Sequence, residues 1–335
     1  MQNTPFIDAT RPAARAAATL LVTAAALAVP FSGRAAAQDP DARPLGALAP
    51  AAAPAGGPLL IVGGGRQPDA LVTRFVELAG GPGAARIAVI PLAGSAESGE
   101  SKAEQFRELG AESFVLLTTA GEARGPAVRA RLEQATGVWF TGGDQSRITA
   151  AMDGTPLLDA LRARNRAGVV VGGTSAGAAI LSPLMLTGSQ VLPGEDTVGY
   201  HGDTFARIAR NTIELVPGFG LLPGVIVDQH FVRRERHNRL LSVVLEHPDH
   251  IGVGIDESTA LEVTPTGEWR VHGESVVMVY DARGATVTDP ASPVLGAAGL
   301  RVHVLPPGSA FDPRTGSVRL GSTPMQGSRH EEPRG

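Results

Sequence analysis

The chain contains no cysteine. It therefore has no disulfide bond, no thiol nucleophile and no cysteine-ligated metal site. Aromatic residues are also scarce, at 4% of 335 residues, and the formal net charge is only -4, which gives no argument for a nucleic-acid partner. Glycine is abundant, at 42 residues, and indicates frequent tight turns and close backbone contacts. With 43% hydrophobic residues, the chain can bury a large core in a single domain.

Residues 1–37 have the layout of a secretory signal peptide. Arg11 and Arg15 precede an uncharged run, rich in alanine, leucine and valine, that extends from Ala16 to Gly33. Small residues at 35–37 form an Ala-x-Ala cleavage site, so we expect cleavage after Ala37 and a secreted or periplasmic protein without stable membrane association. A single membrane anchor is the alternative, because the run is near the lower length limit for a span.

The remaining chain divides by composition into three parts. Residues 38–58 are rich in proline, alanine and glycine and are expected to form a flexible linker. The folded domain is expected over 59–311. Residues 312–335 are polar and rich in glycine and proline, and we expect this tail to be disordered.

Short buried strands alternate with helices in the first half of this domain. Strands are expected at 59–62, 87–90, 114–117, 138–140 and 169–171, and helices at 69–78, 104–109, 126–132 and 148–163. This alternation is typical of an α/β three-layer sandwich, with a mostly parallel central sheet and helices on both faces. A strand at 225–231 and a helix at 233–245 follow. Later strands, from 251 to 305, have no helices between them and predict an antiparallel extension toward the C-terminus.

Ser175 lies where a valine-rich strand meets a glycine-rich turn and a run of small residues. Gly173-Thr174-Ser175-Ala176-Gly177 fits the pattern of a nucleophile elbow, in which a sharp turn exposes the serine at the carboxyl end of the sheet. Amides at the following helix N-terminus would stabilise an oxyanion. The alternative is a turn that only packs tightly or that cradles a phosphate. A second glycine triplet, at 63–65, lacks the dinucleotide fingerprint and is interpreted as a simple turn.

His230 is the candidate base, because it follows the buried part of the strand expected at 225–231 and should reach the same sheet edge as Ser175. Its imidazole needs an acid to orient it. Glu195, in a loop between serine and histidine, could return to this edge. The adjacent Asp196 is an alternative, and Asp228 lies on the same strand face as His230.

Arginines at 234, 236 and 239 begin the helix expected after His230. Guanidinium groups bind carboxylates with two hydrogen bonds, so these residues suit an acidic substrate. A solvated helix face with ion pairs is the alternative. The His-containing segment 246–250 is read as a surface turn because of Pro248, and no metal is expected.

Four segments resemble, in order, motifs of the cyanophycinases, a group of dipeptidase E-like serine peptidases with a class I glutamine amidotransferase-like fold. They read FTGGDQ at 140–145, GGTSAGA at 172–178, DQHF at 228–231 with the three arginines after it, and GIDESTA at 254–260. The resemblance covers roughly 59–305. It implies an enzyme that trims cyanophycin, an arginine-bearing polyaspartate, to β-Asp-Arg dipeptides without a cofactor, and a tendency to form homodimers. The expected signal peptide departs from the storage-granule enzymes of this group and indicates an extracellular or periplasmic type.

The resemblance also implies residue roles. Ser175 would be the nucleophile, His230 the base and Glu195 the acid, with the amides of Gly143 and Ala176 as the oxyanion hole. The substrate-binding positions would be Gln145, Asp228, Gln229, Arg234, Arg236 and Arg239. The segment between Ser175 and His230, which contains Glu195, is longer than in the intracellular members of this group. A serine dipeptidase for short Asp-containing peptides and a non-catalytic binding protein of the same fold remain as alternatives.

Overall fold

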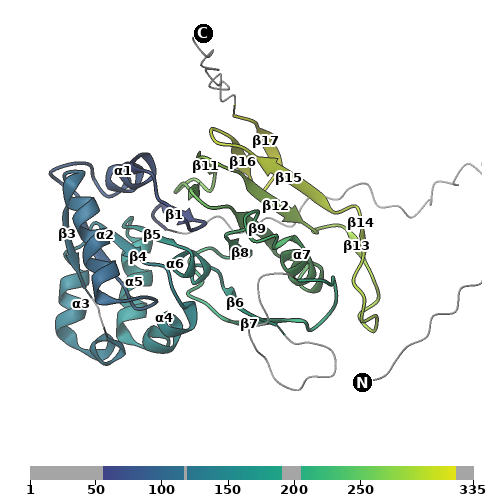
Figure 1. Ribbon diagram of the computed structural model, residues 1–335, viewed down its shortest axis with the longest axis horizontal. Coiled ribbons are helices and arrows are strands. Elements are labelled where there is room, and N and C mark those ends of the chain that lie inside the picture. Colours follow the sequence, from purple (N-terminus) through teal and green to yellow (C-terminus); the bar gives the residue numbers. More distant parts are fainter. Residues whose placement is uncertain (1–55, 117–118, 191–204, 322–335) are drawn as a thin grey trace, which may run out of the picture. The chain divides into compact units, whose positions relative to one another are not determined.

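The computed structural model describes residues 56–116, 119–190 and 205–321 (Figure 1). The signal peptide expected at 1–37, most of the expected linker, Glu195 and Asp196 lie outside these residues. Among the helices of the described residues, none combines the length and the apolar composition needed to span a bilayer.

The largest sheet has nine strands in the order β17-β16-β11-β10-β1-β5-β4-β2-β3. Its parallel part consists of β1 (Leu59–Val62), β2 (Arg86–Ile90), β3 (Glu112–Val115), β4 (Gly137–Phe140) and β5 (Val170–Thr174). Its antiparallel part consists of β10 (Thr259–Val263), β11 (Trp269–Gly273), β16 (Ala310–Asp312) and β17 (Ser317–Arg319). Ordered structure thus extends past residue 311, because β17 pairs with β16 inside the segment expected to be a disordered tail.

Helices cover both faces of the parallel strands. On one face, α1 (Asp69–Leu78) and α2 (Ala96–Glu108) pack Phe75 and Phe106 against Trp139 of β4. On the other face lie α3 (Pro126–Leu132), α4 (Gln145–Met152), α5 (Pro156–Arg166) and α6 (Ala176–Ala179), with η1 (Ala120–Arg124) beside them. The expected fold class, an α/β sandwich with an antiparallel extension, is confirmed.

One expected helix, over 148–163, is two helices in the structure. The chain breaks between α4 and α5, where Gly154 has a φ of 61°. Thr155 then caps α5 by accepting a hydrogen bond from the amide of Leu158, and Pro156 occupies its first position. The continuous apolar spacing concealed this break.

A second sheet of four strands has the order β15-β12-β9-β8. Its strands are β8 (Val225–Gln229), β9 (Ile251–Ile255), β12 (Val277–Asp281) and β15 (Arg301–Leu305). The helix α7 (His237–Glu246) joins β8 to β9 and packs on this sheet (Figure 1), so β8 and β9 run parallel. The sequence instead predicted that the strand leading to His230 belongs to the same sheet as the strand leading to Ser175.

The region after α6 contains a hairpin that the sequence did not predict. Strands β6 (Leu184–Gln190) and β7 (Ile213–Pro217) pair antiparallel in a two-stranded sheet. A further small pair is formed by β13 (Thr286–Val287) and β14 (Ala297–Ala298). The β6–β7 hairpin matters for function because it forms one side of the cavity described next.

Candidate active site

Ser175 lies on a sharp turn between β5 and α6. Its backbone has φ 55° and ψ -111°, a strained conformation for a residue other than glycine. The turn is possible because Gly173 and Gly177 face each other closely: a Cβ at Gly173 would lie 2.5 Å from the carbonyl oxygen of Gly177. This is the geometry of a nucleophile elbow, with the hydroxyl held at the end of the strand.

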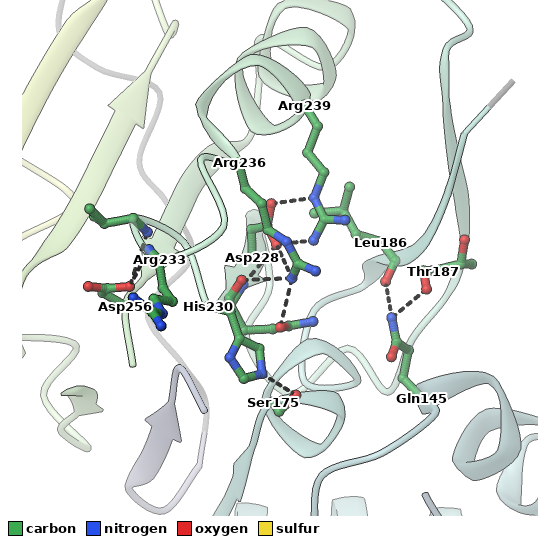
Figure 2. A network of polar contacts seen from close by, with 12 residues as sticks. Gln145, Ser175, Leu186, Thr187, Asp228, His230, Arg233, Arg236, Arg239 and Asp256 are labelled. Atoms are coloured by element: carbon green, nitrogen blue, oxygen red, sulfur yellow. Dashed lines mark hydrogen bonds and ion pairs between the residues drawn. The ribbon is translucent and has the colours of Figure 1, made fainter. Parts of the chain in front are cut away.

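His230 directly follows β8 and reaches Ser175 from the second sheet. Its Nε2 lies 2.9 Å from Ser175 Oγ (Figure 2). Its backbone also has a positive φ, 48°, and its amide donates to the carbonyl of Gly63 at 2.7 Å. The structure therefore brings the expected nucleophile and base within hydrogen-bond distance.

A carboxylate that the sequence reasoning did not select completes this arrangement. Glu257 Oε1 lies 2.6 Å from Nδ1 of His230, so the imidazole bridges Ser175 and Glu257. Glu257 comes shortly after the end of β9, with Asp256 between them, and His230 comes directly after the end of β8. The signal was therefore present: the helix between the two strands makes them parallel, and carboxyl ends of parallel neighbours meet. Glu195, the expected acid, lies outside the described residues, and its role stays a prediction.

The pKa of the His230 imidazole is lowered below its usual value. Burial is the main cause, and the charges of Arg234 and Arg236 act in the same direction, while Glu257 opposes them through its hydrogen bond and charge. A lowered pKa keeps the ring neutral near pH 7. A neutral imidazole whose Nδ1–H is held by a carboxylate presents a free Nε2 that can accept the serine proton.

The two amides expected to form an oxyanion hole both border Ser175. Gly143 lines the same cavity as the serine, and Ala176 is the first residue of α6. Neither amide donates a hydrogen bond to any residue that the structure describes. Gly143 has a φ of 137°, and a Cβ there would lie 2.1 Å from the carbonyl oxygen of Ala93, so this position requires glycine. Two such amides beside a serine can stabilise a developing oxyanion.

A cavity of about 1030 Å³ opens in front of Ser175. Four of the six residues expected to bind substrate line it: Gln145, Gln229, Arg234 and Arg236. Acidic side chains line it too, namely Asp144, Asp153 and Glu214. The cavity thus presents both signs of charge next to the serine.

The other two expected binding residues, Asp228 and Arg239, are buried outside the cavity lining. Arg239 donates to both carboxylate oxygens of Asp228, and both residues are at most 1% exposed. Arg236 lies 3.7 Å from the same carboxylate and donates to the carbonyl and the side-chain oxygen of Gln229. Figure 2 shows this network above Ser175. The buried Asp228–Arg239 pair therefore lies next to Arg236 and helps to fix its position.

Gln145 also has a structural contact. Its Nε2 donates to the carbonyls of Leu186 and Thr187, at 2.9 Å and 2.6 Å (Figure 2). The residue expected to contact substrate thus holds β6 against the start of α4. Its contact ties the β6–β7 hairpin to the cavity wall.

The helix after His230 begins later than the sequence predicted, at His237. Residues 231–236 instead form a turn, because Asp256 accepts the amides of Val232 and Arg233 at 3.1 Å and 2.9 Å, and Glu235 has a φ of 52°. Arg234 and Arg236 consequently project from a turn rather than from a helix N-terminus. Within the described ranges, no three histidine or acidic side chains form a group that could hold a metal ion.

Residues 59–268 match the model of peptidase family S51. A cyanophycinase from Synechococcus elongatus is 36% identical over 266 residues, which cover 76% of this chain and 77% of that protein. A cyanophycinase from Geminocystis herdmanii is 32% identical over 77% of this chain and 94% of that protein. The crystal structure of a peptidase from an acI-B1 actinobacterium, at 23% identity and a TM-score of 0.52, covers 74% of this chain and 97% of that one and shares the fold.

Proposed function

The chain belongs to peptidase family S51 and is a serine-type peptidase, and we propose from this that it hydrolyses cyanophycin to β-Asp-Arg dipeptides. The observation that carries the proposal is the position of His230, between Glu257 and Ser175, where Ser175 itself lines a cavity that both arginines and carboxylates border. The named relatives support the substrate, and the site supports the reaction.

In the proposed reaction, Nε2 of His230 takes the proton from Ser175 Oγ as that oxygen attacks the substrate carbonyl carbon. Glu257 accepts a hydrogen bond from Nδ1–H, which fixes the ring orientation and stabilises the imidazolium that forms. The carbonyl oxygen becomes an oxyanion, which the amides of Gly143 and Ala176 stabilise.

Collapse of this intermediate expels the amine of the leaving group, which takes the proton from His230 and leaves an acyl ester on Ser175. Water then attacks the ester by the same route. His230 removes the water proton and returns a proton to Ser175 Oγ, so the enzyme is regenerated. No other chemical group is required by these steps.

The charges of the cavity suit a substrate that carries both carboxylates and guanidinium groups. Arg234 can bind a carboxylate of the polymer end with paired hydrogen bonds, and Arg236, whose Nη1 is held by Gln229, adds positive charge to the same wall of the cavity. The negative charges of Glu214, Asp144 and Asp153 can bind an arginine side chain of the substrate. Glu214 also accepts a hydrogen bond from Thr187 Oγ1 at 2.6 Å. The volume of about 1030 Å³ exceeds what one small ligand needs and leaves room for a polymer end.

The test is incubation of the protein with insoluble cyanophycin, with unmodified polyaspartate and with Asp-Xaa dipeptides, followed by mass spectrometry of the soluble products. We expect β-Asp-Arg from cyanophycin, little product from polyaspartate, and none from any substrate with Ser175→Ala. Cleavage of the short dipeptides alone would instead indicate a dipeptidase and overturn the cyanophycin assignment.

We further propose that the protein is exported, since an insoluble polymer outside the cell can be degraded only by an exported hydrolase. The layout of residues 1–37 supports this. Expression in a bacterial host with a functional secretion system, followed by sequencing of the mature N-terminus, should give a first residue of Gln38. A protein that stays in the cytosol with residues 1–37 intact would contradict the proposal.

A further inference from the structure

The last residue of β1, Val62, and the turn Gly63–Gly65 after it together contact each part of the candidate catalytic group. Three consecutive carbonyls accept amides from three distant segments. Val62 accepts from Ser175 at 3.0 Å, Gly63 from His230 at 2.7 Å, and Gly64 from Ser258, the neighbour of Glu257, at 2.9 Å. One turn of backbone therefore fixes the relative positions of the nucleophile, the base and the segment of the acid.

The side chains of His230 and Glu257 also contact this turn, and each lies where a glycine leaves no room for a Cβ. A Cβ at Gly64 would lie 2.3 Å from Cε1 and 2.5 Å from Nε2 of the His230 ring. A Cβ at Gly65 would lie 2.8 Å from Cβ and 2.9 Å from Oε2 of Glu257. The imidazole thus rests directly on the Cα of Gly64, and the glutamate on that of Gly65.

We propose that Gly64 is a positioning residue for the reaction, with Gly65 in the same role for Glu257; this rests on the proposed Ser175–His230–Glu257 mechanism. The bare Cα of Gly64 forms the surface that holds the imidazole in line with Ser175 Oγ. Any side chain there must push the ring away from its 2.9 Å contact. The role is distinct from the conformational freedom that glycine gives a turn.

Two other glycines separate these effects. Gly64 has a φ of 110°, and Gly80, at the end of α1, has a φ of 119°. The nearest atoms to a Cβ at Gly80 are 3.8 Å away, an ordinary contact. Gly64→Ala and Gly80→Ala therefore introduce similar backbone strain, but only the first displaces a side chain. Gly83, with a φ of 80° and nothing within 4 Å, is the matching control for Gly65, whose φ is 68°.

The test compares Gly64→Ala with Gly80→Ala in the full-length protein. The measurements are kcat and KM on cyanophycin, the rate of inactivation by a fluorophosphonate, which phosphonylates the serine with loss of fluoride, and Tm. We expect similar falls of a few degrees in Tm for both variants. For Gly64→Ala alone, kcat and the inactivation rate should fall about 100-fold, with KM within about threefold, because small misplacements of a reacting group cost this much. Equal inactivation rates in the two variants would overturn the proposal.

Two further outcomes are informative. If Gly64→Ala does not fold, the comparison of Gly65→Ala with Gly83→Ala tests the proposal. We expect the inactivation rate of Gly65→Ala to fall about tenfold, a smaller loss than for Gly64→Ala, because Glu257 is more exposed than His230 and can shift more easily. An unchanged rate there overturns the proposal. If the wild-type protein reacts with the fluorophosphonate but releases nothing from cyanophycin, the substrate assignment fails and the positioning comparison still stands.

Discussion

His230 and His272 each contact a glutamate, at 2.6 Å to Glu257 and 2.7 Å to Glu262, yet the two pairs have opposite arrangements. In the first pair the imidazole is the inner partner, with 11% of its side chain exposed against 32% for the glutamate. In the second pair the glutamate is the inner partner, with 2% exposed against 31% for the histidine.

The third partner differs as well. The free nitrogen of His230 faces a serine hydroxyl, whereas Glu262 accepts two further hydrogen bonds from Arg74, at 2.9 Å and 3.0 Å. Burial lowers the pKa of His230. Burial opposes ionisation of Glu262, but the hydrogen bonds from His272 and Arg74 outweigh it and lower the pKa of that carboxyl to about 2. A histidine–glutamate pair is therefore suited to catalysis where the imidazole is buried and faces a hydroxyl. It is suited to stability where the carboxylate is buried and an arginine binds it as well.

Replacing each histidine should give the largest contrast. His230→Ala removes the base, and we expect kcat on cyanophycin to fall by about 10⁴-fold or more. His272→Ala should leave kcat within about threefold and lower Tm. Turnover assays and thermal unfolding of the two purified variants check this. A His230→Ala protein that is folded and retains near-normal turnover contradicts the mechanism.

Replacing each glutamate should give the next largest effect. Glu257→Gln keeps the shape of the side chain but loses the charge that stabilises the imidazolium, and we expect kcat to fall by about 10³- to 10⁴-fold. Glu262→Gln should affect stability instead. Glu195→Gln is the third arm of this experiment. If Glu195→Gln is inactive while Glu257→Gln is active, Glu195 is the acid, as the sequence led us to expect.

The acid stability of the protein should depend on Glu262. Its pKa is lower in the folded state than the ordinary 4.5, so its contribution is present above about pH 4.5 and is lost as the pH falls toward 2. The full contribution corresponds to about 3 kcal/mol. Urea unfolding of the wild type and Glu262→Gln at pH 6 and pH 3 checks this. The difference in the free energy of unfolding between the two proteins should shrink at the lower pH.

The smallest expected effect concerns Arg234. Its charge lowers the pKa of His230, so Arg234→Gln should raise that pKa and shift the acid limb of the pH–rate profile to higher pH. The fluorophosphonate inactivation rate is the suitable measurement, because it does not require a carboxylate to bind. Arg74→Gln, next to the other pair, is the control and should leave this profile unchanged.

The sequence predicted the parallel half of the fold and the meeting of Ser175 with His230 because both follow short, fully buried strands. It did not predict the contact of Glu257 with His230. The strands from 251 onward were expected to be antiparallel, whereas the helix between β8 and β9 makes these two strands parallel and brings their carboxyl ends together. The sequence did not predict the β6–β7 hairpin, because its strands are only partly buried and lack an alternation of apolar and polar residues. Likewise, the contact of Gly64 with the imidazole depends on tertiary packing, which a local glycine pattern does not reveal.

The three carbonyls at the end of β1 have a consequence for the synthesis of this protein. The chain is synthesised from its N-terminus, so residues 62–64 leave the ribosome before their hydrogen-bond partners at 175, 230 and 258. A nascent chain that ends before residue 258 lacks at least one of these three contacts. The site around Ser175 and His230 can therefore be assembled completely only late in the synthesis of the chain.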